Sequence, residues 1–155
     1  MLTIQIDSRE KAKAIRKILD TFEKNGVVHF VSKLPIGDYM SLDNARLCID
    51  RKQNLGELCR NVCQEHKRFR AELERAKQLG VKLFILCEHG GQIKNLSDVI
   101  NWKNPRLKQS PMAMSGERLY KVLSAMSAKY GVEFRFCTKA MTGNEIIRIL
   151  TEAQR

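Results

Sequence analysis

Short apolar runs typical of strands alternate along this chain with amphipathic stripes typical of helices, and this order constrains the fold most. Strands are expected at residues 2–7, 27–34, 38–43, 46–52, 81–87 and 132–137. Helices are expected around residues 15–22 and 55–79, after Ser115 and after Thr142, with a short one at 97–100. The alternation, with one early hairpin, predicts an α/β layered fold with a mixed sheet.

The length and composition predict one intracellular domain with an anionic partner. A chain of 155 residues without repeats or linkers has the usual size of one domain, which we expect to cover residues 1–155. The net charge of +11 favours an anionic partner, although a basic surface that only water solvates is the other interpretation. No apolar run approaches the ~18 residues of a membrane span, and the start "MLTIQIDSRE" lacks the zones of a signal peptide. We therefore expect a cytoplasmic protein without a membrane partner, as five cysteines without a CxxC pair also indicate.

The stretch "LPIGDYMSLDNARLCIDRKQ" at residues 34–53 places acids and a lysine in a predicted hairpin. Residues two apart on a strand share a face, about 6.6 Å apart, so Asp50 and Lys52 should point the same way. Pairing of the two strands would bring Asp38 close to Asp50. Two close carboxylates repel each other, and a divalent cation such as Mg²⁺ or Mn²⁺ removes the conflict. Lys52 could then hold or deprotonate a water, whereas the alternative is a surface hairpin with weak ion pairs.

Three motifs occur in an order that resembles a known family. They are "IDSRE" at 6–10, "GDY" at 37–39 and "IDRK" at 49–52. Together they resemble the nuclease domain of the XPF/Hef family, within the PD-(D/E)XK superfamily, and the second half is similar to small stand-alone, phage-type members. The resemblance implies a three-layer α/β/α restriction-endonuclease-like fold with a mixed central sheet, and metal-dependent DNA cleavage.

The resemblance also implies roles for individual residues. The catalytic set would be Asp7, Arg9, Asp38, Asp50 and Lys52. The metal ligands would be Asp38, Asp50 and the backbone carbonyl of Arg51, with Asp7 as an auxiliary carboxylate near the metal. Arg9 would contact or orient the phosphate, and Glu10, which follows it, could lie at the same sheet edge.

Two departures from the family pattern concern acids. Asp50 stands where the family usually has Glu, a change that the wider superfamily accepts. The family also has an acid four residues after the lysine, where this chain has Gly56. Glu57 is next to it, and the sequence leaves open whether Glu57 substitutes or the auxiliary acid is missing.

Basic segments supply the candidate DNA contacts. These are Arg9, then Lys67, Arg68 and Arg70 of the basic helical segment 66–77, and Lys103 and Arg106 of the polar segment 101–116. The alternatives are a solvated helix with local ion pairs and a loop that only connects its neighbours. His66 is interpreted as a core histidine, with a phosphate contact near the metal as the second interpretation.

We therefore expect an Mg²⁺- or Mn²⁺-dependent DNA endonuclease in repair, recombination or phage DNA processing, with branched or flap DNA among its candidate substrates. The alternative is a non-catalytic DNA-binding subunit of a nuclease complex. The sequence leaves open the preferred DNA structure, and whether a homodimer or a protein partner supplies specificity.

Overall fold

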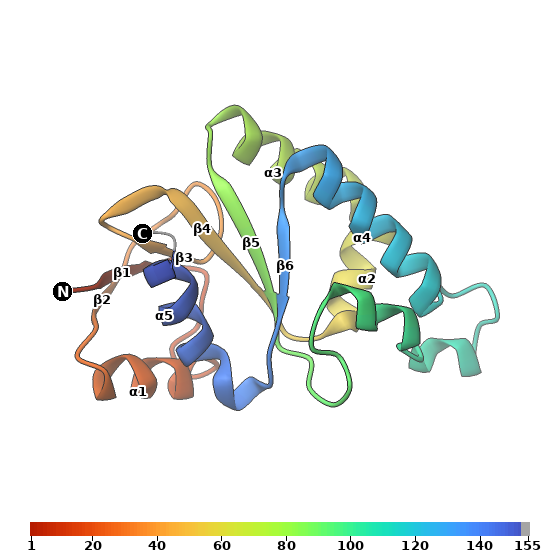
Figure 1. Cartoon of the computed structure of the whole chain (residues 1–155), viewed down its shortest axis with the longest axis horizontal. Coiled ribbons are helices and arrows are strands. Elements are labelled where there is room, and N and C mark those ends of the chain that lie inside the picture. Colours follow the sequence, from red (N-terminus) through yellow and green to blue (C-terminus); the bar gives the residue numbers. More distant parts are fainter. Residues whose placement is uncertain (153–155) are drawn as a thin grey trace.

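The computed structural model describes residues 1–152 and contains a six-stranded mixed sheet with the order β2-β1-β3-β4-β5-β6 (Figure 1). The strands are β1 (Thr3–Ile6), β2 (Val28–Val31), β3 (Tyr39–Ser41), β4 (Asn44–Lys52), β5 (Lys82–Cys87) and β6 (Glu133–Phe136). β3 is antiparallel to β1 and β4, and the other neighbours are parallel. The predicted mixed sheet is therefore confirmed, whereas residues 153–155 of the expected domain lie outside the described residues.

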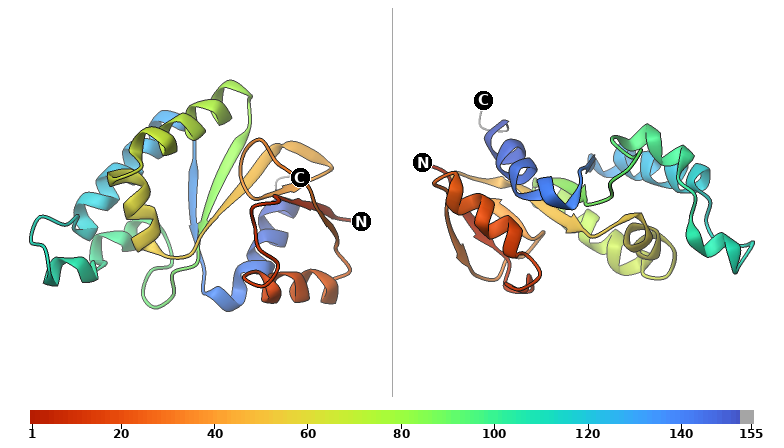
Figure 2. Two further views of the ribbon diagram at one scale, coloured as in Figure 1. Left: turned by 180° about the vertical axis from the view of Figure 1, so that it is seen from behind. Right: turned by 90° about the horizontal axis from the view of Figure 1, so that it is seen from below.

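Helices cover both faces of the sheet. They are α1 (Arg16–Lys24), α2 (Leu55–Cys63), α3 (His66–Gln78), α4 (Gly116–Tyr130) and α5 (Thr142–Glu152), with short 3₁₀ helices η1 (Leu96–Asn101), η2 (Pro105–Lys108) and η3 (Lys139–Met141). α1 and α5 lie on one side, and α2, α3 and α4 on the other (Figures 1 and 2). Within residues 1–152, none of the helices combines the length and the apolar character that a membrane crossing needs.

Alternate residues of β5 belong to the two separate cores. Phe84 and Leu86 pack with α1 and α5, whereas Ile85 and Cys87 pack with α2, α3 and α4. Successive side chains of a strand point to opposite faces, so a strand between two helical layers needs apolar residues at every position. This explains the continuous apolar run at 83–87, and the two cores establish the three-layer α/β/α arrangement.

The expected hairpin forms from β3 and β4. Tyr39 pairs with Ile49 and Met40 with Cys48, and the backbone N–H of Asp38 donates to the Ile49 carbonyl at 2.7 Å. Gly37 precedes this strand with a φ of +72°, and a Cβ atom there would lie 3.1 Å from the Ile49 carbonyl oxygen. Only glycine combines that backbone conformation with so close an approach. The Gly-Asp pair therefore sets Asp38 against the end of β4.

The single helix expected at 55–79 is wrong. The structure has two helices, α2 and α3, which residues 64–65 separate. Both helices turn buried apolar residues toward the same core, among them Cys59 of α2 and Phe69 of α3. His66 is exposed at the first residue of α3, so its interpretation as a core histidine is also wrong.

Candidate active site

The predicted acids Asp38 and Asp50 line one cavity, with a volume of ≈380 Å³. Asp38 lies just before β3, and its Oδ2 accepts the backbone N–H of Arg51 at 2.8 Å. The acids around the cavity are Glu10, Asp38, Asp50, Glu57, Glu65 and Glu72, and the basic residues are Arg9, Arg51, Lys52, Arg60 and Arg68. The hairpin therefore brings together two aspartates that are twelve positions apart in the sequence.

The two aspartates oppose each other electrostatically. Burial raises the pKa of Asp38 well above its usual value, and the nearby charge of Asp50 raises it further. Asp50 is 6% exposed, and its Oδ2 is buried without a hydrogen bond, although Lys52 Nζ lies 3.3 Å away. This site therefore has more carboxylate oxygen than its own donors satisfy.

Lys52 lies on the same side of β4 as Asp50, as the strand period predicts. Its ammonium group is 5.5 Å from the centre of the Phe69 ring, and its side chain is 13% exposed. Burial alone would lower the pKa of Lys52, but Asp50 and the neighbouring glutamates outweigh it and raise the pKa. The carboxylates around Lys52 therefore favour its charged form.

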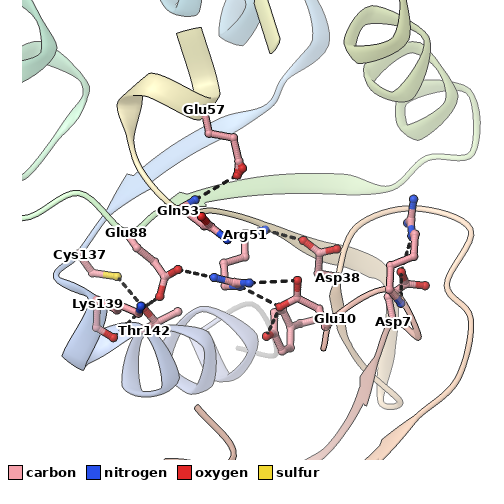
Figure 3. A network of polar contacts seen from close by, with 12 residues as sticks. Asp7, Glu10, Asp38, Arg51, Gln53, Glu57, Glu88, Cys137, Lys139 and Thr142 are labelled. Carbon is pink, nitrogen blue, oxygen red and sulfur yellow. Dashed lines mark hydrogen bonds and ion pairs between the residues drawn. The ribbon is translucent and has the colours of Figure 1, made fainter. Parts of the chain in front are cut away.

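Arg51 points to the opposite side of the strand, into a buried network of charges (Figure 3). Its guanidinium donates to Glu10 Oε2 at 2.8 Å and to Glu88 Oε1 at 2.5 Å. Glu10 also accepts the Tyr39 hydroxyl at 2.7 Å, and Glu88 accepts the Thr142 hydroxyl at 2.5 Å. The network therefore connects the β3–β4 hairpin to the loop that follows β1 and to the first residue of α5.

Asp7 is fully buried but does not line the cavity. Its Oδ1 accepts the backbone N–H of Leu34 at 2.7 Å, and its Oδ2 accepts Nε of Arg9 at 2.5 Å. Burial by itself raises the pKa of Asp7, but these donors outweigh it and hold the pKa below its usual value. The structure therefore places Asp7 as the support of Arg9, whose exposed side chain does line the cavity.

The remaining predicted residues divide between the cavity and the outer surface. Glu10, Glu57 and Arg68 line the cavity, and Glu57 also accepts the backbone N–H of Gln53 at 3.2 Å. His66, Lys67, Arg70, Lys103 and Arg106 are exposed and do not line it. The DNA contacts predicted from the outer residues of α3 and from segment 101–116 therefore have no counterpart in this cavity.

Sequence reasoning missed Glu72 and Glu88. Burial and the charge of Asp50 raise the pKa of Glu72, which faces the cavity from α3. A sequence signal existed for each: Glu72 flanks the apolar stripe of α3, and Glu88 follows the apolar run of β5. Because β5 is parallel to β4, with Lys52 opposite Cys87, Glu88 lies beside the end of the "IDRK" strand.

The donor chemistry of the cavity fits a hard divalent cation. Asp38 and Asp50 offer carboxylate oxygens, which Mg²⁺ and Mn²⁺ prefer, and Asp50 Oδ2 is buried without a well-formed hydrogen bond, although Lys52 Nζ lies 3.3 Å away. The geometry is not that of a closed cage, because residues 1–152 contain no group of three or more His, Cys, Asp or Glu side chains arranged to hold a metal. Mg²⁺ tolerates such a site, since it commonly keeps several water ligands beside one or two carboxylates.

A mixed sheet between two helical layers, with two acids and a lysine on its central hairpin, defines a restriction-endonuclease-like domain. The chain belongs to the ERCC4 domain family, which matches residues 6–150. The expected resemblance to the XPF-type nuclease domain is thereby confirmed.

Solved structures agree with this assignment of the fold. XPF from Aeropyrum pernix matches with a TM-score of 0.69 and 21% identity over 99% of this chain and 65% of that chain. The same protein in complex with DNA matches with a TM-score of 0.66 and 19% identity over 99% and 66%. This chain therefore spans slightly less than two thirds of the length of those structures. No curated protein sequence matches it.

Proposed function

We propose that this chain is a metal-dependent endonuclease that hydrolyses phosphodiester bonds in DNA. The observation that supports the proposal most is the meeting of Asp38, Asp50 and Lys52 in one cavity, where burial and mutual repulsion raise the pKa of Asp38. A carboxylate pair of this kind costs stability unless a cation neutralises it. The DNA-bound structure of the related XPF and the net charge of +11 favour DNA as the substrate.

Asp38 and Asp50 would hold the metal ion, Mg²⁺ or Mn²⁺. When bound, such an ion supplies Lewis-acid polarisation of the phosphate and activation of the attacking water. The N–H of Arg51 keeps the Asp38 carboxylate oriented toward the cavity. The backbone carbonyl of Arg51 would be the third protein ligand.

The basic residues of the cavity would bind and orient the phosphate. Lys52, kept charged by Asp50, would donate to a phosphate oxygen and stabilise the negative charge that develops there. Arg9 would donate to a second oxygen, and Asp7 would fix its guanidinium by the hydrogen bond at 2.5 Å. The water oxygen would bond to the phosphorus as the bond to the 3′ oxygen breaks. The water would lose its proton to solvent and the 3′ oxygen would take one from solvent, which leaves a 5′-phosphate and a 3′-hydroxyl.

The test is nicking of supercoiled plasmid by the purified protein in Mg²⁺, in Mn²⁺ and in EDTA. We expect cleavage with either metal and none in EDTA. Asp43→Asn is the matched control for Asp38→Asn. It removes one carboxylate charge from an exposed turn residue outside the cavity. Binding of DNA without cleavage in any divalent cation, by a folded wild-type protein, would favour the non-catalytic subunit instead.

A further inference from the structure

Two smaller hollows continue from the active-site cavity along one side of α3. The first, of ≈250 Å³, is lined by Arg9, Pro35, Arg68, Ala71, Glu72 and Arg75. The second, of ≈370 Å³, is lined by Ser8, Arg9, Lys33, Leu34, Pro35 and Arg75. Each hollow shares wall residues with the one before it, and all three share Arg9. The three hollows form one continuous depression. The two outer hollows together are called the basic groove from here on.

The walls of the basic groove are strongly cationic. Arg9, Lys33, Arg68 and Arg75 face one acid, Glu72, which lies at the end nearest the active site. The side chains of Lys33 and Arg75 are exposed, and neither forms an ion pair within residues 1–152. Exposed cations without local partners attract an anionic ligand at the least cost, because no existing ion pair has to be broken.

Asp7 holds the two loops of the groove together. One of its oxygens binds the N–H of Leu34 in the loop that carries Lys33, and the other binds Arg9. This explains why a fully buried carboxylate lies beside the cavity without lining it. The groove is thus a built feature of the fold, in which Arg9 has a fixed position between the active site and Lys33.

The chemistry of the groove suits a sugar–phosphate backbone rather than bases. No aromatic side chain lines either hollow, so bases have no surface on which to stack. Arg and Lys side chains recognise phosphates without reading sequence. The hollow on the other side of the hairpin is different, because Arg51 and Glu88 in its wall are already paired and Lys139 is the one further basic residue there.

We propose that the basic groove binds the backbone of the cleaved DNA strand on one side only of the scissile phosphate. Arg9 would contact the scissile phosphate at the inner end of the groove, and Arg75 and Lys33 would contact phosphates farther along. The inference rests on the proposed function, since it takes the cavity of Asp38 and Asp50 as the place of cleavage. In this proposal the main contacts are Arg75 and Lys33, which line the groove, instead of the Lys67 and Arg70 that the sequence predicted.

Binding of a fluorescent duplex in EDTA tests the groove without cleavage. The double variant Lys33→Ala/Arg75→Ala is compared with Lys24→Ala/Arg118→Ala, which removes the same two charges from exposed positions outside all three hollows. We expect the groove variant to lower the log–log salt slope by about 2, since each phosphate contact contributes about 0.9, and the control to leave it unchanged. Equal slopes for the two variants would overturn the proposal, as would a larger effect of Lys67→Ala/Arg70→Ala.

Neutral methylphosphonate linkages test the one-sided placement. Substrates carry two such linkages on either the 5′ or the 3′ side of the cut, and initial cleavage rates are measured with Mg²⁺. We expect wild-type protein to be slowed at least tenfold by linkages on one side only, and the Lys33→Ala/Arg75→Ala protein to lose this sensitivity. Equal sensitivity on both sides would refute the groove. A protein that shows the slope difference but cuts no DNA would refute the nuclease proposal and leave the groove supported.

Discussion

Asp38 is the residue at which the folded protein carries an electrostatic cost. Burial and the charge of Asp50 raise its pKa, so its charged form is less favourable in the folded chain than in the unfolded one. Such a group lowers the free energy of unfolding as the pH rises above its unfolded pKa of about 3.9. A cation in the cavity would remove this cost, which links stability to the proposed activity.

The Asp38→Asn protein should lose cleavage and, without metal, melt at a higher temperature than wild type at pH 7. Asparagine is uncharged yet keeps an oxygen that can accept the Arg51 N–H. Added Mg²⁺ should raise the melting temperature of wild type but not of the variant. The measurement is thermal melting with EDTA and with Mg²⁺, beside plasmid nicking. If the folded variant cuts like wild type, Asp38 is not part of the site.

Substitutions of Asp50 test whether the charge or the length of its side chain matters for the carboxylate pair that it forms with Asp38. Asp50→Asn removes the charge and should abolish cleavage, whereas Asp50→Glu keeps it and restores the acid that the family usually has. One extra methylene could misplace the ion and cost roughly 10²-fold in rate. Nicking rates of both variants are compared after melting curves show that they are folded. Full activity of Asp50→Asn would rule out the catalytic interpretation of "IDRK".

Asp7 should make the fold sensitive to acid. Its pKa is held below the usual value in the folded protein, so its stabilising effect is present above about pH 4 and is lost as the pH falls through the folded pKa. Asp7→Asn should destabilise the protein by about 2 kcal/mol at pH 7, because an amide cannot serve both donors as a carboxylate does. Urea unfolding between pH 7 and pH 3 checks this. A constant difference between wild type and variant over that range would contradict the assignment.

At the scale of the elements, Glu88 is the residue that links β4 to α5 in the network around Arg51. Glu88 receives both the Arg51 guanidinium and the Thr142 hydroxyl, and its side chain is almost completely buried. Removing one partner of a buried ion pair leaves the other charge uncompensated. Arg51 lies between Asp50 and Lys52 in β4, so we expect the contact of Arg51 with Glu88 to position the strand that carries the site.

Glu88→Gln should therefore lower the free energy of unfolding by about 3 kcal/mol, the usual cost of breaking a buried pair. Thr142→Val, which removes a single hydroxyl from the same network, should cost about 1 kcal/mol. Both are measured by urea unfolding. For the folded Glu88→Gln protein we also expect a lower kcat with little change in KM, because the groove that binds DNA is intact. A change confined to KM would mean that Glu88 does not position the site.

The elements that the sequence predicted best are those with a strong local period. The run at 81–87 identifies β5, and the twelve-residue separation of Asp38 from Asp50 allows their meeting to be inferred from one hairpin. The break between α2 and α3 was missed because the apolar residues of both helices fit one continuous helical pattern. Glu72 and Glu88 each lie beside a local apolar pattern, but that pattern alone does not place them at the hairpin. Their approach depends on the docking of α3 and on the parallel pairing of β5 with β4.

At the scale of the whole molecule, the charge of +11 should dominate DNA binding. A site that touches about five phosphates would give a log–log salt slope of ~−4.5. Low aromatic content favours weak sequence preference, because stacking contributes little. Titration of two unrelated duplexes at several salt concentrations measures both properties. A flat salt dependence would count against a mainly electrostatic interface.

The pairing of β3 with β4 also decides which surface of the hairpin becomes reactive. Side chains alternate along β4, so a slip of one residue would exchange Asp50 and Arg51 between the cavity and the opposite core. Such a molecule could keep much of its compactness and still have a guanidinium where the reaction needs a carboxylate. The irregularity between Met40 and Ser41 and the close approach at Gly37 both oppose that slip. Substitutions that remove the irregularity or the close approach could therefore yield folded molecules of which some have the shifted register and are inactive. The specific activity of such a preparation would fall before its helical content changes measurably.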